Sequence, residues 1–169
     1  GLGMLAGGFG FDRLSRRDVR WPLWGPAVAL VTAAPLYFGA FASTSAGISL
    51  AFVWLANFAL ITYMAPSLAT VQNLVGPRMR AIATAIVSMV IGLMGAGLGP
   101  GILGMASDFF ATATFSAGDF ITSCPGGRAP AGAAASLDEA CRGASSLGLR
   151  YALMSVLVLF FWAAVHYLL

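Results

Sequence analysis

Long stretches without a charged side chain are the feature that most limits how this chain can fold. Residues 21–77 hold no charge over 57 consecutive positions, and residues 81–107 form a second such stretch. One membrane-crossing helix takes about 20 residues, so the first stretch is long enough for two. Of the 169 residues, 59% are hydrophobic and 9% are charged, whereas roughly a quarter of a soluble domain is charged. The sequence therefore predicts an all-α integral membrane protein.

The apolar sequence divides into four spans and a helix tail. Small and polar residues at 42–47 break the first stretch, and residues 151–169 supply a further apolar run. The expected elements of one bundle, residues 1–169, are a helix tail at 1–10, spans at 23–42, 47–73, 80–107 and 150–169, and a loop at 108–149. Both ends of the chain lie within apolar sequence, so we expect a piece of a longer protein.

The arginines predict how the spans are oriented. Four of them, Arg13, Arg16, Arg17 and Arg20, precede the first span, whereas the loop at 43–46 carries no charge. The loop at 108–149 mixes both signs. Cytoplasmic loops carry an excess of basic residues, so the arginine loops and the C-terminus are expected in the cytoplasm, in an inner or plasma membrane. Because the bases flank spans, we expect no nucleic-acid partner.

The cysteines, Cys124 and Cys141, both fall in the loop expected outside, and the chain has no others. Two cysteines in one exported loop favour a disulfide; the alternative is two free thiols. Their spacing is wrong for a metal site and no histidine lies nearby, so we expect no bound metal.

The most informative string runs from Gly8 to Arg17. A helix is expected to end at the glycines, and Asp12 is then followed by three arginines. Asp12 could face the N-terminus of a neighbouring helix, where backbone N–H groups favour an anion, and the arginines could pair with carboxylates or lipid headgroups. Such a charge lock would hold two helix bundles in one conformation. The alternative is an ordinary basic loop.

These residues resemble the major facilitator superfamily, whose signature loop reads G-x-x-x-D-R-x-G-R-R. The match covers Gly8, Asp12, Arg13, Arg16 and Arg17, with a departure at Ser15, where the pattern has glycine. With four spans after the motif, the resemblance implies the C-terminal half of a 12-helix fold, from the end of helix 8 through helix 12. It also implies an N-terminal half of the same chain as partner.

Other strings resemble the spinster-like branch of that superfamily. They are residues 63–69, 72–81, 97–100 and 149–153, with a departure at Ala65, where relatives often have glycine. This resemblance is compatible with a lipid-like or amphipathic solute, but it does not separate lipid-like from drug-like substrates.

The third span is rich in glycine. Gly95 and Gly99 form a small-xxx-small pair, which permits close helix packing, and Pro100 favours a kink. Packing and bending both remain open for these residues, and Pro66 is a further candidate for either role.

Polar residues within the spans are candidates for lining a central cavity. Asn57 is expected near mid-membrane, where an amide should face protein or water, so it either contacts solute or bonds a neighbouring helix. The other candidates, for which structural roles are the alternative, are Tyr63, Gln72, Thr84 and Ser88. No acid lies in the middle of a span, so a proton carrier is expected in the N-terminal half.

The sequence shows no catalytic motif, so no enzymatic activity and no cofactor are expected. The leading hypothesis is a secondary active transporter that moves an organic solute by alternating access, with or without proton coupling. The competing class is a non-transporting membrane subunit or scaffold held together by glycine packing. Further spans upstream in the reading frame would support the transporter.

Overall fold

The computed structural model describes residues 1–169, which form helices joined by turns, without strands. Four helical stretches are long and apolar enough to cross a membrane: Trp21–Ala42, Ala46–Asn73, Pro77–Thr114 and Ala135–Leu168. The predicted all-α membrane fold with four full spans is confirmed.

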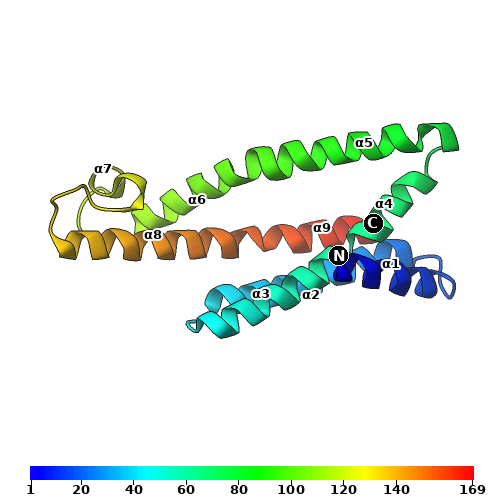
Figure 1. Cartoon of the computed structure of the whole chain (residues 1–169), viewed down its shortest axis with the longest axis horizontal. Coiled ribbons are helices and arrows are strands. Elements are labelled where there is room, and N and C mark those ends of the chain that lie inside the picture. The colour runs from blue at the N-terminus through cyan, green and yellow to red at the C-terminus, as the bar shows by residue number, and fades with distance from the viewer. The chain divides into compact units, whose positions relative to one another are not determined.

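The chain divides into two compact units. Unit 1 comprises residues 1–89 and 156–169, and unit 2 comprises residues 90–155. The helices of unit 1 are α1 (Leu2–Ser15), α2 (Trp21–Ala42), α3 (Ala46–Ile61), α4 (Met64–Asn73), most of α5 (Arg80–Ile91) and α9 (Val158–Leu168) (Figure 1). A 3₁₀ turn at Pro77–Met79 precedes α5.

Unit 2 begins near the end of α5 with a π-helical segment, Gly92–Leu98. It continues with α6 (Gly99–Thr114), the short α7 (Phe120–Ser123), a 3₁₀ turn at Pro125–Gly127 and α8 (Ala135–Val156). Figure 1 shows α7 between α6 and α8 in chain order, in yellow.

The sequence predicted that the first helix ends at its glycines, but α1 continues past them. It continues through Asp12 to Ser15, because Gly8 and Gly10 keep helical backbone angles. The signature residues Asp12 and Arg13 therefore lie on the last turn of a helix, and only Arg16 and Arg17 lie in the turn beyond it.

The predicted loop at 108–149 is also shorter than expected. Helix α6 continues to Thr114 and α8 begins at Ala135, so the connection is 115–134. The part of α8 that precedes the apolar run is stabilised by charged side chains. Asp138 lies in the first turn of the helix, and the Asp138 carboxylate is 2.9 Å from the Nε of Arg142. Acids near a helix N-terminus and i,i+4 ion pairs both stabilise helices.

In unit 1, α1 packs closely on the α3–α4 break. Pro66 has no N–H to donate to the carbonyl of Thr62, so the helix is interrupted at Thr62 and Tyr63. Gly7 of α1 lies against that carbonyl, so closely that an added Cβ would overlap its oxygen. One turn earlier, a Cβ on Gly3 would lie 2.7 Å from the carbonyl oxygen of Phe58.

Small residues fill the rest of the unit 1 core. Ala27, Leu30 and Ala164 form a buried cluster between α2 and α9, and Gly39 of α2 lies against the ring of Phe52 of α3. Lipid gives no hydrophobic force between helices, so membrane helices associate through small side chains that allow close approach.

Unit 2 has an apolar cluster around a disulfide. Cys124 and Cys141 are bonded, with their Cα atoms 5.6 Å apart. Phe115 and Phe120 pack edge to face beside them at 5.6 Å between ring centroids. Helices α6 and α8 approach closely at Gly148, where an added Cβ would lie 2.5 Å from the carbonyl oxygen of Ser107.

We predict that Gly7→Ala destabilises the protein, because overpacking a close contact costs about 1–3 kcal/mol. The matched control is Gly10→Ala on the same helix, where an added Cβ meets nothing within 4 Å. That control should be neutral or slightly stabilising, since alanine favours a helix over glycine. The midpoint of thermal unfolding in detergent measures both; equal midpoints for the two variants would contradict the close contact.

We predict that mass spectrometry of unreduced protein finds a peptide linked through Cys124 and Cys141, which are 17 residues apart in sequence. Removing the bond with Cys124→Ser and Cys141→Ser together should lower stability by at most about 3 kcal/mol in the chain-entropy model. Two thiols that alkylate freely in native membranes would overturn this prediction.

Candidate functional site

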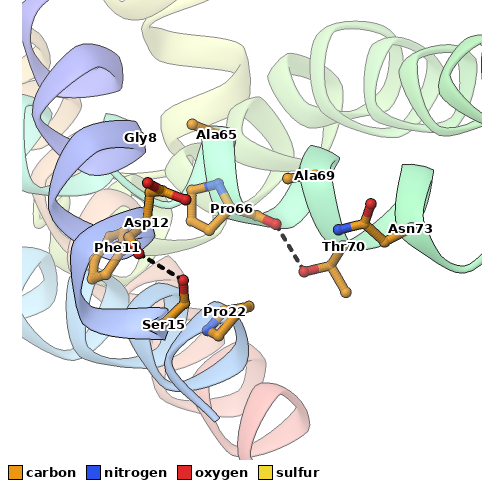
Figure 2. A pocket seen from close by; sticks show the side chains of 10 residues that line it. All are labelled: Gly8, Phe11, Asp12, Ser15, Pro22, Ala65, Pro66, Ala69, Thr70 and Asn73. Atoms are coloured by element: carbon orange, nitrogen blue, oxygen red, sulfur yellow. Dashed lines mark hydrogen bonds between the residues drawn. The ribbon is translucent and has the colours of Figure 1, made fainter. Parts of the chain in front are cut away.

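A cavity of about 360 Å³ lies between α1, the start of α2 and α4, all within unit 1. Its walls carry four polar side chains among small and apolar ones. Figure 2 shows the ten lining residues: Gly8, Phe11, Asp12, Ser15, Pro22, Ala65, Pro66, Ala69, Thr70 and Asn73. Two of the five residues that match the superfamily signature, Gly8 and Asp12, therefore border the cavity.

The close approach of α1 to α4 shapes this cavity. Gly8 has no side chain, and a Cβ there would be 3.7 Å from that of Ala65, so the two helices lie in near contact above the cavity. Phe11 closes another side, because its ring lies on Gly25 of α2 and stacks on Trp21 with centroids 6.4 Å apart. Glycines thus set the spacing on two sides.

Two of the four polar groups are already used. The hydroxyl of Ser15 donates to the carbonyl of Asp12 at 2.8 Å, and that of Thr70 donates to the carbonyl of Pro66 at 2.8 Å. The Asp12 carboxylate, which is paired with the exposed Arg16, and the Asn73 amide are the groups that could interact with a molecule entering the cavity. In Figure 2 the side chain of Asp12 extends from α1 toward Pro66 on α4.

Asp12 pairs only with its own helix terminus. Its carboxylate lies 3.2 Å from Nη2 of Arg16, and the two side chains are 67% and 78% exposed. An exposed ion pair contributes little to stability. Arg13 and Arg17 are exposed and form no ion pair. The charged side chains of the signature string are therefore accessible to a partner segment that does not belong to residues 1–169.

Comparisons with known proteins identify the fold. No protein-family model matches the chain. Over 107 residues it is 36% identical to an MFS-type efflux pump of Mycolicibacterium smegmatis (strain ATCC 700084 / mc(2)155), a match covering 63% of this chain and 25% of the pump. The crystal structure of a bacterial homologue of the human lysosomal transporter Spinster, inward-facing and unoccupied, matches with a TM-score of 0.76 and 28% identity. That match covers 98% of this chain and 36% of the homologue.

This chain has the fold of the C-terminal half of a major facilitator superfamily transporter. The predicted resemblance to the superfamily and to its spinster-like branch is confirmed. The chain spans a quarter of the pump and about a third of the Spinster homologue. In the facilitator numbering, α1 is the end of helix 8 and α2 is helix 9; α3–α4, α5–α6 and α8–α9 are helices 10, 11 and 12.

The five polar candidates of the facilitator spans do not gather in one place. Gln72 donates to the hydroxyl of Thr84 at 3.3 Å and so joins helix 10 to helix 11 within unit 1. Asn57 is half-buried and donates to the carbonyl of Val53 in its own helix at 2.9 Å. Tyr63 lies half-buried at the α3–α4 break, and Ser88 is exposed. None of the five lines the cavity.

The two proline candidates interrupt facilitator helices 10 and 11. Pro66 is buried, forms part of the cavity wall and breaks helix 10. In helix 11 the backbone widens to π-helical geometry before Pro100, and the N–H of Gly99 donates to the carbonyl of Met94, five residues back. Pro100 has no N–H for the carbonyl of Ala96, which removes one regular hydrogen bond.

No other helix of unit 2 packs on Gly95 or Gly99 of helix 11. A Cβ added to Gly95 would meet nothing within 4 Å, and one on Gly99 would meet only the carbonyl of Met94, at 3.8 Å. The irregular backbone supports bending at this segment, and packing of its glycines on another helix stays a prediction.

The sequence did not predict the close contact of Gly3 and Gly7 with the α3–α4 segment, nor the hydrogen bond between α4 and α9. The small-xxx-small spacing of Gly3 and Gly7, the same signal used for Gly95 and Gly99, would have found the first contact. The hydrogen bond between the hydroxyls of Ser67 and Tyr167, 2.8 Å long and spanning 100 positions, has no local sequence signal.

We predict that Pro100→Ala restores regular α-helical geometry in helix 11, because alanine supplies the missing N–H. Hydrogen–deuterium exchange in the peptide covering 92–100 should slow relative to the parent. Gly101→Ala is the matched control, since it places an alanine at the next position, in open space, without adding a backbone donor. Unchanged exchange in Pro100→Ala would show that the proline does not cause the irregularity.

Proposed function

We propose that this chain is the C-terminal half of a secondary active transporter that moves an organic solute, lipid-like or amphipathic, by alternating access. The observation that carries the proposal is the match to the Spinster homologue over 98% of the chain at a TM-score of 0.76. The matched proteins are named as an efflux pump and as a homologue of a transporter.

The proposed partner is an N-terminal half of the same chain, in the lipid bilayer. Large apolar side chains along helix 11 are exposed, among them Met89, Leu93 and Met105. Exposed apolar surface on this scale marks a protein or membrane interface. The match covering 36% of the Spinster homologue leaves room for such a half.

The proposed orientation has the arginine loops in the cytoplasm. Arg78 and Arg80 lie at the start of the single span Pro77–Thr114, and Cys124 and Cys141 lie after it. A disulfide belongs to an oxidising compartment, so the side of the disulfide would be outside. The basic loops and the disulfide thus support one orientation by independent arguments, with the C-terminus in the cytoplasm.

The signature string would act as a charge lock between the two halves. Asp12 has one local partner, Arg16, and its carboxylate borders a cavity that these residues leave open. In one conformation a helix end of the other half would fill that cavity, and the carboxylate would stabilise its positive N-terminal dipole. The lock would therefore bias the equilibrium between conformations rather than bind solute.

Coupling to protons, if present, would use a carrier in the other half. Intramembrane acids are the usual proton carriers, and the spans Trp21–Ala42 and Ala46–Asn73 contain no acid. In the other two spans the acids lie toward the ends: Asp108 near the end of Pro77–Thr114, and Asp138 and Glu139 near the start of Ala135–Leu168.

The experiment that tests the function is reconstitution of the intact protein in liposomes, with a fluorescent lysophospholipid and a cationic dye as probes. We expect protein-dependent movement of at least one probe that saturates with its concentration. Well-folded protein that moves neither probe, nor any member of a wider panel of organic solutes, would contradict the proposal and favour the scaffold.

We predict that Asp12→Asn lowers transport per molecule by about five- to thirty-fold, because a partly buried charge–dipole interaction contributes about 1–2 kcal/mol. Expression should change little, since the side chain is 67% exposed. Asp138→Asn is the matched control: it also removes an acid from an i,i+4 pair with arginine, at 2.9 Å, away from the signature string. Equal transport by Asp12→Asn and the parent would refute the charge lock.

A further inference from the structure

The turn between α1 and α2, Arg16–Arg20, carries more positive charge than its acids neutralise. Residues 12–20 contain four arginines and two aspartates, a net charge of +2. Both acids are engaged locally: Asp12 pairs with Arg16 at 3.2 Å, and the carboxylate of Asp18 accepts the backbone N–H of Arg20 at 2.9 Å. The guanidinium groups of Arg17 and Arg20 thus have no carboxylate partner.

Apolar and aromatic groups accompany these arginines. Val19, between Asp18 and Arg20, is 86% exposed. The guanidinium of Arg20 lies 5.8 Å from the ring centroid of Trp24, and Trp21 is the first residue of the span. Tryptophan favours the level of the lipid headgroups, so the turn presents its cations at that depth, with an apolar side chain at its tip.

We propose that the Arg16–Arg20 turn binds the headgroup phosphate of an anionic phospholipid. Arg17 and Arg20 supply the guanidinium groups, which match phosphate geometry and hydrogen-bond it in a bidentate manner. Val19 and Trp24 lie against the upper part of the acyl chains. A headgroup that carries its own cation is disfavoured beside a turn of net charge +2, so the site selects anionic over zwitterionic lipid.

A soluble phosphate compound would use the arginines but not Val19 or Trp24. The exposed valine and the tryptophan at the start of a span therefore favour a membrane lipid as the occupant. The site shares Arg16 and Arg17 with the signature string. Its test measures lipid binding rather than transport, so failure of the lipid site would leave the proposed function standing.

The test is native mass spectrometry of the intact protein, delipidated in detergent and titrated with phosphatidylglycerol or phosphatidylcholine of the same acyl chains. The parent should prefer phosphatidylglycerol. Each basic residue near a membrane surface contributes a factor of about five to anionic-lipid binding, so Arg17→Gln with Arg20→Gln should weaken phosphatidylglycerol binding by about 25-fold and leave phosphatidylcholine binding unchanged.

The matched control is Arg128→Gln with Arg142→Gln, which removes the same charge from unit 2 and should retain the preference. Arg17→Lys with Arg20→Lys should bind phosphatidylglycerol more weakly than the parent and more tightly than the glutamine variant, because the charge remains while the bidentate hydrogen bonds are lost. Three outcomes would overturn the site. The glutamine variant could bind as tightly as the parent, or the unit 2 control could lose as much binding as the glutamine variant. The third is a loss in the lysine variant as large as that in the glutamine variant. Competition by glycerol phosphate as effective as that by the lipid would also overturn it, because the occupant would then not be a lipid.

Discussion

The close contact between α1 and the interrupted helix 10 is the constraint on which the rest of unit 1 depends. Pro66 leaves the carbonyl of Thr62 without its regular helical donor, and Gly7 approaches that carbonyl where any side chain would collide. Contacts between a glycine Cα–H and a carbonyl oxygen recur where helices pack this closely. Because α1 is held there, its next turns, with Gly8, Phe11 and Asp12, lie along α4 and form the cavity wall.

The amino-acid composition of the unit 1 core follows from the lipid that is expected to surround the helices. Side chains buried in unit 1 are mainly alanine, including Ala33, Ala34 and Ala56, whereas large apolar residues such as Leu50 and Trp54 face outward. In lipid, a leucine gains little by leaving the surface, and helices gain by approaching through small residues. The arrangement is the reverse of that in a water-soluble protein, where the large apolar side chains form the core.

Unit 2 combines a constrained end with an irregular one. The cluster around Cys124 and Cys141 fixes the short α7 against α8 through Phe120 and Ala144. At its other end, Gly92–Leu98 has π-helical geometry, which places one extra residue in each turn and often marks functional positions in helices. The disulfide restricts one end of this unit, whereas no cross-link restricts the glycine-rich segment of helix 11.

The sequence by itself determined the membrane class, the four spans, the signature string and the pairing partners available to the two cysteines. These follow from hydropathy over about 20 residues, from charge counts and from fixed spacing, all of which act locally along the chain. It misjudged the ends of α1, α6 and α8, because helices continue past apolar runs where glycines keep helical angles or where Asp138 and Arg142 pair. Tertiary structure alone decided that Asp12 borders a cavity, that Gly7 touches the Thr62 carbonyl, that Ser67 bonds Tyr167 and that Gln72 bonds Thr84. Each of these joins separate helices, and their relative rotation and depth depend on side-chain packing that no pattern within one helix contains.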